Sequence, residues 1–308
     1  MKANTTLNNF ANANGIAGLT EASLQAIMDN QPGYSIETAK RFLTFQDRIN
    51  AELLQHRVIT ANEYCAWFEQ GDISEAQVKA FVVQFATFSN LFLIAQLKKT
   101  INADSIEGMR ASKEILANEI GVVFKSNKEK PSDANQADED KIISIEGSVE
   151  GGAFHFKAAH FEWLLRMAEK LGMGFNDIGK RRHGTPSTLF YCDELARLYG
   201  NEDYMTSQAS SYAVENWAAA GFWDQLVAGF EKYNFLNAAE LPLGFFTWHA
   251  KIEAQHAAHT QEELEELYFS REINEDKFIY DGNEMLEGVT AFWDGLEAQR
   301  KKLAGYTS

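Results

Sequence analysis

Apolar residues recur with a period close to that of an α-helix along most of the chain. In residues 35–58 they stand at positions 39, 42, 43, 45, 49, 53 and 54, which places them close to helical spacing. Similar spacing or long apolar runs mark residues 20–30, 62–71, 74–100, 105–124, 157–173, 187–200, 203–233, 242–269 and 280–303. The pattern therefore predicts an all-α protein, with 74–100 as a central apolar helix.

Three stretches break this pattern. Residues 1–20 are rich in Asn, Thr, Ala and Gly, and we expect them to form an irregular arm. Residues 125–140 are highly charged with almost no apolar residue, which predicts an exposed loop. Residues 141–156 alternate in places and contain three glycines, as a short hairpin would. We thus expect one helical domain over 1–308, with its core at about 74–303 and an exposed insertion at 125–153.

The amino-acid composition supports a helical fold and excludes some classes of binding partner. Hydrophobic residues make up 45% of the 308 positions and only four residues are proline, which favours long helices around a core. The formal net charge of −16 argues against binding to nucleic acid or to an anionic membrane, because both need Lys and Arg. We therefore expect no nucleic-acid and no membrane partner; a homodimer is compatible with the sequence.

The cysteines and the N-terminus bear on where the protein works. Cys65 and Cys192 are far apart and form no motif, as is usual for reduced thiols in a cytosolic protein. The first twenty residues lack the apolar run of a signal peptide. No stretch of about 18 apolar residues is present, so we expect no membrane span and a cytoplasmic location.

Candidate chemistry begins in the segment GFFTWHAKIEAQHAAHTQEELEEL, residues 244–267, which holds three of the seven histidines. At about 100° per residue, Glu253 lies at roughly +40° and His256 at roughly −20° from His249, whereas His259 lies at roughly −80°. His249, Glu253 and His256 therefore share one face. Two imidazoles and a carboxylate suit iron with open coordination positions. The alternative is a solvated helix face.

Three further residues interrupt apolar helix faces. Glu215 is the only charged residue between Asp203 and Asp224, and an unpaired buried carboxylate would cost several kcal/mol. Glu119 and His160 also have mainly apolar helical neighbours. The alternatives are a Glu at a helix edge and a core histidine with an ordinary hydrogen-bond partner. Carboxylate-rich sites between facing helices are how helical proteins hold two iron or manganese ions.

The order ANEIG, HFEWLLRMAEKLG, YAVENWAAAGFW and FFTWHAKIEAQH resembles the haem-oxygenase-like diiron oxidases and oxygenases, over roughly residues 80–270. These proteins are relatives of thiaminase-type, coenzyme-PQQ-synthesis and chlamydial death-domain-associating proteins. The resemblance implies a bundle of about seven core helices, here with extra N-terminal helices. It also implies two iron ions, with the ligands Glu119, His160, Glu215, His249, Glu253 and His256.

One departure from the family pattern concerns the first two ligands. The family has Glu and His seven apart on one helix, whereas Glu119 and His160 are 41 positions apart. Either the stretch 125–153 loops out of a preserved helix pair, or Glu146 or Glu150 replaces Glu119. We favour the loop.

The resemblance implies O2-dependent oxidation of a small amino-acid-derived or fatty-acid-like metabolite, by N-oxygenation, oxidative C–C cleavage or decarboxylation. We expect an aromatic substrate pocket, and Arg181 and Arg182 could hold a substrate carboxylate; the alternative is that they lie in a solvated loop. The pocket residues that we select are Tyr212, Phe222, Phe245, Trp248, Arg181 and Arg182.

Two other functions are alternatives to a diiron oxidase. The first is a metal-free thiaminase-like or PQQ-synthesis-like enzyme, for which Cys192 is the candidate nucleophile. The second is a non-catalytic helical interaction protein.

Overall fold

The computed structural model describes residues 5–124, 154–156 and 158–305, with the backbone alone for 123, 124, 154–156 and 252–259. Within these ranges the chain is almost entirely helical. In chain order the elements are α1 (Thr5–Asn14), α2 (Glu21–Met28), α3 (Ile36–Glu52), α4 (Arg57–Thr60), α5 (Glu63–Phe68), α6 (Glu75–Ile101), α7 (Ile106–Glu119), β1 (Val122–Phe124), β2 (Phe154–Phe156), α8 (His160–Lys170), the 3₁₀ turn η3 (Arg181–His183), α9 (Pro186–Glu194), the π-helical turn η4 (Leu195–Tyr199), α10 (Tyr204–Ala218), α11 (Phe222–Asn237), α12 (Gly244–Ser270) and α13 (Glu275–Leu303).

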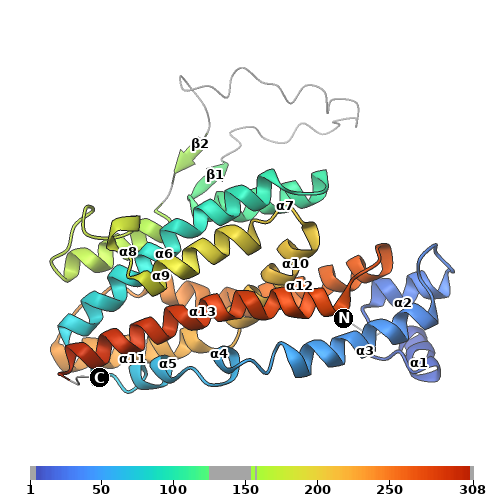
Figure 1. Cartoon of the computed structure of the whole chain (residues 1–308), viewed down its shortest axis with the longest axis horizontal. Helices are drawn as coiled ribbons and strands as arrows, with labels where there is room; N and C mark the ends of the chain where they lie inside the picture. The colour runs from blue at the N-terminus through green and yellow to red at the C-terminus, as the bar shows by residue number, and fades with distance from the viewer. Residues whose placement is uncertain (1–4, 125–153, 157, 306–308) are drawn as a thin grey trace.

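Two long helices organise the bundle. Helix α13 runs along its length and packs against α9, α10 and α6 (Figure 1). Helix α6 packs against α7, α8, α9 and η4, and it begins at a capping box formed by Ser74 and Gln77. Helix α12 packs against α10 and α11. Since α6, α10 and α12 are thus surrounded by other helices, side chains on their facing sides are removed from bulk water.

The N-terminal region is helical where we expected an irregular arm. Helix α1 forms because Leu7 and Ala11, four positions apart, are buried together against the rest of the protein. The following segment is fixed at Thr20, whose N–H and hydroxyl donate to the buried Glu265 carboxylate at 3.0 and 2.7 Å. The expectation of an irregular arm was therefore wrong for Thr5–Asn14, where composition concealed a short apolar repeat.

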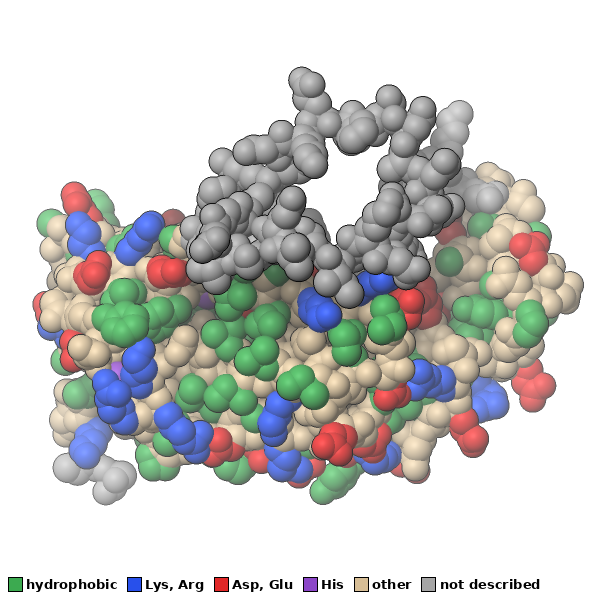
Figure 2. All heavy atoms as spheres, turned by 90° about the horizontal axis from the view of Figure 1, so that it is seen from above, with side chains coloured by type: hydrophobic (Ala, Val, Ile, Leu, Met, Phe, Trp, Pro, Cys, Tyr) green, Lys and Arg blue, Asp and Glu red, His purple; other side chains and the backbone are tan. Residues whose placement is uncertain are grey.

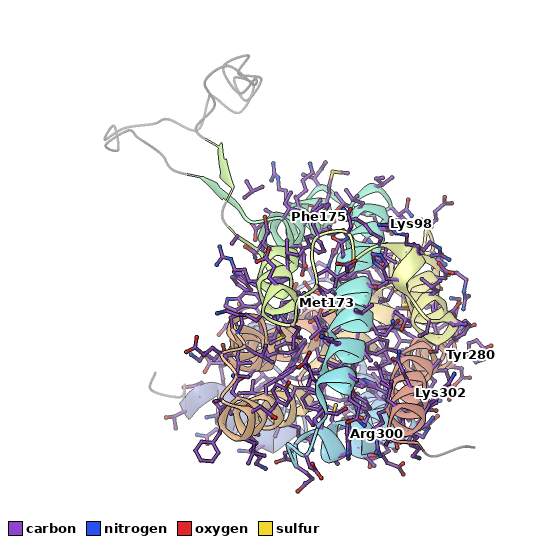
Figure 3. All side chains as sticks on the ribbon, turned by 90° about the vertical axis from the view of Figure 1, so that its left-hand side faces the viewer. Lys98, Met173, Phe175, Tyr280, Arg300 and Lys302 are labelled. Carbon is purple, nitrogen blue, oxygen red and sulfur yellow. The ribbon has the colours of Figure 1, made fainter. Side chains whose placement is uncertain are left out.

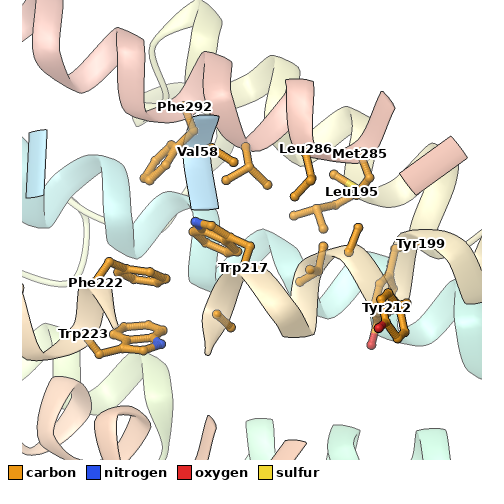
Figure 4. Packing of buried hydrophobic residues seen from close by; sticks show 14 of the residues in the cluster. Val58, Leu195, Tyr199, Tyr212, Trp217, Phe222, Trp223, Met285, Leu286 and Phe292 are labelled. Atoms are coloured by element: carbon orange, nitrogen blue, oxygen red, sulfur yellow. The ribbon is translucent and has the colours of Figure 1, made fainter. Parts of the chain in front are cut away.

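The single helix expected over 203–233 is two helices, α10 and α11. Gly221 separates them with a φ of 88°, in the left-handed region where a side chain would be strained. The turn brings Phe222 beside Trp217, with ring centroids 4.8 Å apart and ring planes 16° from parallel, and Trp223 follows in the same group of rings (Figure 4). The break between α10 and α11 therefore places the rings of Trp217, Phe222 and Trp223 together inside the bundle.

The sheet is a single antiparallel pair in the described part of the chain. Val122 in β1 is opposite Phe156 in β2, and Phe124 is opposite Phe154. Of the hairpin expected over 141–156, only residues 154–156 are described, and they form β2, which pairs with β1 before the insertion and not with a strand within 141–156. The expected insertion, 125–153, lies outside the described residues, as does the loop expected at 125–140.

Helix α6 is long and apolar enough by length and composition to cross a membrane, and it is the one described helix that is. Its position in the bundle argues otherwise, because it packs against α7, α8, α9, α13, η3 and η4, and half of its most apolar window is buried. On its outer side, Ile94, Leu97 and Ile101 are exposed. Figure 2 shows apolar side chains interspersed with Lys, Arg, Asp and Glu on the face seen from above. We interpret α6 as a core helix with one apolar outer stripe.

Candidate functional site

A cavity of about 390 Å³ lies between α6, α7, α8, α10 and α12. Eight aromatic residues contribute to its wall: Phe85, Phe88, Phe92, Tyr191, Trp217, Trp223, Phe245 and Trp248. A larger depression of about 690 Å³ lies over α3, but it is open and shallow, and no histidine lines it. We therefore place the candidate site in the enclosed aromatic cavity, which also contains four of the six residues that we selected as ligands.

The structure brings Glu119 and His160 into contact across the 41 intervening positions. Glu119 is the last residue of α7 and His160 is the first of α8, and the β1–β2 pair lies between them in the chain. Nδ1 of His160 lies 2.6 Å from Oε2 of Glu119, with side chains 7% and 12% exposed. An ionised carboxylate only accepts, so the imidazole donates. This is the arrangement that we expected if the insertion loops out of a preserved helix pair.

His249 adds a second imidazole beside this pair. Its Nδ1 donates to the Phe245 carbonyl oxygen at 2.7 Å, which leaves the ring's lone pair on Nε2. The ring stacks on Trp223 at 4.5 Å between centroids, and the His160 ring lies 4.7 Å away. Histidine ligands are usually oriented by a hydrogen bond at the other ring nitrogen. His249 thus has the orientation that a ligand would need.

Glu215 lines the same cavity from α10 and is half-buried. One turn earlier on the same face, the Ser211 hydroxyl accepts a hydrogen bond from Nζ of Lys99 at 2.6 Å. Desolvation lowers the pKa of Lys99, and the carboxylates of Glu215 and Glu263 oppose that shift. The carboxylate of Glu215 therefore lies close enough to the Lys99 ammonium for their charges to interact.

The α12 residues Glu253 and His256 can be placed by backbone only. Helix α12 is continuous from Gly244 to Ser270, so both residues keep the face that helical spacing gives them relative to His249. Their side chains lie outside the described atoms. Among the side chains that are described, no group of three or more His, Cys, Asp or Glu is arranged to hold a metal ion.

Two of the selected pocket residues line the cavity and four do not. Phe245 and Trp248 contribute to the wall. Tyr212 faces away, where its hydroxyl donates to Gln261 at 2.8 Å and burial raises its pKa to about 12. Phe222 lies behind the wall, with its ring against Trp217 and Trp223.

Arg181 and Arg182 do not line the cavity either, which corrects the expectation that they hold a substrate carboxylate. Both are exposed on η3. Arg181 makes a two-pronged ion pair with Asp193, with both distances 2.7 Å, and Arg182 donates to the Asn176 carbonyl oxygen. A basic cluster in the sequence gives no direction for its side chains, and here a carboxylate one helix away binds the first arginine.

Sequence reasoning missed Lys99 and Glu263, and spacing could have found both. Lys99 continues a stripe along α6 that includes Phe85, Phe88, Phe92 and Gln96, all of which line the cavity. Glu263 lies fourteen positions after His249, which returns it to within roughly 40° of that histidine on α12.

The two cysteines are not placed for catalysis. Both are buried, and neither lines the cavity. Burial raises the pKa of the Cys192 thiol to about 12, so almost none of it is thiolate at neutral pH. The cysteine-nucleophile alternative therefore has no support in this arrangement.

Comparison with known proteins identifies the fold. No protein-family model matches the chain, and no curated protein matches it. Among solved structures, it is similar to a domain of unknown function with a heme oxygenase-like fold from Shewanella denitrificans, with a TM-score of 0.55 and 14% sequence identity. The match covers 87% of this chain and 95% of that domain. The protein therefore has an all-α, heme oxygenase-like fold, which confirms the fold implied by the sequence resemblance.

Proposed function

We propose that the protein is a non-haem diiron enzyme that uses O2 to oxidise a small metabolite. The observation that carries the proposal is the contact between Glu119, His160 and His249 at the wall of an aromatic cavity that Glu215 also lines. Four helices contribute these residues, and they come from the segments that resemble the diiron family. A cytoplasmic location is part of the proposal.

The donor chemistry fits two iron ions. Two imidazoles line the cavity among the described side chains, with the carboxylates of Glu119 and Glu215 among its four glutamates, and helical spacing along the α12 backbone puts positions 253 and 256 on the side that carries His249. Glu119, His160, Glu215, His249, Glu253 and His256 would then hold the metal. When bound, iron would supply the redox chemistry with O2. Because the described donors alone do not make a three-residue group, the proposal needs the α12 pair.

The other residues of the cavity would bind and shield the substrate. Trp223, Phe245 and Trp248 surround the two imidazoles and exclude water from them. The same rings offer a planar, apolar wall to an organic substrate. The amino-acid-derived and fatty-acid-like metabolites both remain within this proposal, as do N-oxygenation, C–C cleavage and decarboxylation.

A second candidate is a metal-free enzyme in which Glu119 and His160 form a general-base dyad. The 2.6 Å contact between them favours it, because a carboxylate that accepts from Nδ1 fixes the tautomer in which Nε2 can accept a proton. This candidate makes no use of Glu215, Glu253 or His256. Iron content therefore separates the diiron enzyme from the metal-free enzyme and from a non-catalytic interaction protein, both of which should bind no iron.

The decisive measurement is iron stoichiometry and coupling after anaerobic loading with ferrous iron. We expect two iron ions per chain and a Mössbauer spectrum of a dinuclear site. Glu119→Ala should lose at least one iron, whereas Glu107→Ala, an exposed carboxylate in the first turn of the same helix, should bind as much as the wild type. Iron that is absent, or only mononuclear, in the wild type would refute the diiron proposal.

A further inference from the structure

The cavity is long, and its two ends differ in chemistry. Its lining residues on α12 run from Phe245 to Glu263, which is about 27 Å at 1.5 Å per residue. The end near His249 is built from aromatic rings and imidazoles. The end near Thr260 is polar, with Gln96 and Lys99 from α6 and Gln208 and Ser211 from α10. A ligand that fills the cavity would be elongated, with one apolar and one polar end.

Lys99 is the one Lys or Arg among the described residues that line the cavity. Its position is fixed by two contacts. Nζ donates to the Ser211 hydroxyl at 2.6 Å, and it lies 4.2 Å from the centroid of the Tyr199 ring. Burial around the amine is substantial enough to lower its pKa. A desolvated ammonium held in this way can bind an anion strongly, because little water competes with it.

The carboxylates of the cavity differ in how much they oppose an anionic ligand. Glu119 is already hydrogen-bonded to His160, and Glu215 would bind metal under the proposed function. Glu114 and Glu263 also line the cavity, but both residues are exposed, so water and salt screen their charges. With iron bound, Lys99 is thus the interior charge that remains to be matched by a ligand.

We propose that Lys99 binds the anionic head group, such as a carboxylate, of an elongated substrate whose apolar body lies between the aromatic walls. This assignment rests on the proposed function, because iron would neutralise the two interior carboxylates. It makes Lys99 a specificity-determining residue, and it places the head group beside the Ser211 hydroxyl, one helical turn from Glu215 on α10. An amine substrate would instead be repelled by Lys99.

A matched pair of probes tests the sign of the charge. The acid is 6-phenylhexanoate and the base is 6-phenylhexylamine, which share length and body. Binding is followed by quenching of tryptophan fluorescence, since Trp217, Trp223 and Trp248 line the cavity. The variant is Lys99→Met and its control is Lys98→Met. Lys98 precedes Lys99 in α6, is exposed and donates to the Ala196 carbonyl oxygen at 3.3 Å (Figure 3).

In iron-loaded protein we expect saturable binding of the acid to the wild type and to Lys98→Met, and at least about tenfold weaker binding to Lys99→Met. The amine should bind more weakly than the acid to the wild type and should gain affinity in Lys99→Met. If circular dichroism shows that Lys99→Met is unfolded, Lys99→Gln takes its place, and Lys99→Arg should retain acid binding.

Acid binding that is absent from the wild type, equal in Lys98→Met and Lys99→Met, or weaker than amine binding would overturn the proposal. The titrations are repeated without metal, where the ratio between wild type and Lys99→Met is the criterion. A chain that binds no iron but keeps a tenfold dependence on Lys99 refutes the diiron function alone. A chain that binds two irons but shows no dependence on Lys99 refutes the anion site alone.

Discussion

The hairpin between Glu119 and His160 makes a quantitative prediction. Residues 125–153 connect the paired residues Phe124 and Phe154, and an antiparallel pair of this kind can be closed by a turn of two to five residues. We therefore consider a variant in which 125–153 is replaced by a four-residue turn containing Asn-Gly. The replacement removes both alternative carboxylates, Glu146 and Glu150, and leaves Glu119 and His160 at their helix ends.

The expected change in stability follows from loop closure. Shortening the connection from roughly 29 to about 4 residues is nearly three halvings, each worth about 0.6 kcal/mol, so the folded state gains about 1.8 kcal/mol. This treats the replaced residues as connecting chain alone. For a domain of this size, the melting temperature should rise by about 2–5 °C.

Scanning fluorimetry measures the melting temperature, and the iron assay described above measures ligand integrity. We expect the shortened protein to bind as much iron as the wild type, and Glu119→Ala in the full chain to bind less. The opposite pair of results would show that the first carboxylate lies within 125–153, and it would reject our assignment of Glu119. An unchanged iron content with a lower melting temperature would refute only the loop-closure estimate.

Two further predictions concern helix register and packing. His249→Ala, Glu253→Ala and His256→Ala should each abolish or strongly reduce iron binding. His259→Ala should bind nearly as much iron as the wild type, because position 259 is rotated by roughly 80° from His249. Equal losses for His256→Ala and His259→Ala in the iron assay would show that the register is wrong. Gly229→Ala should destabilise the protein by about 3 kcal/mol in urea unfolding, since the added Cβ would lie 2.2 Å from the Phe68 carbonyl oxygen. The control Gly244→Ala, whose Cβ would have no atom within 4 Å, should change the free energy of unfolding by under about 1 kcal/mol. Similar values for both variants would contradict the packing of α11 on α5.

The helices were predictable from sequence wherever an apolar period ran without interruption. The all-α class follows from that period, the bounds of α6 follow from its long apolar run, and α13 ends where it was expected but begins at Glu275, five positions before the predicted start. The division of 203–233 was not predictable from the period, because the apolar pattern continues across Gly221 while the backbone there turns left-handed. Helix α1 was missed because only Leu7 and Ala11 carry its burial, in a segment that is otherwise polar.

Site residues could be predicted where the sequence shows which face of a helix is buried. His160, Glu215 and His249 line one cavity because each lies on a helix face that is buried in the bundle. Glu119 lines it as well, although Ile115 on its helix is exposed and Val122 belongs to β1. Tyr212 shows the limit of this reasoning. It follows Ser211, which lines the cavity, but one position on a helix is a rotation of about 100°, and Tyr212 faces the opposite side. Arg181 and Arg182 failed because a loop has no period from which to infer direction.

Helix α7 gives one wall of the cavity a much lower local stability than the others. Of its 14 residues only Ser112 is buried, while Ile106 and Ile115 are exposed. Amide exchange in such a helix proceeds by opening events that leave the rest of the bundle folded. Glu119 is its final residue, at the end where helices fray first. We therefore expect this wall to open at a smaller free-energy cost than global unfolding, with Glu119 at the end of the helix that opens first.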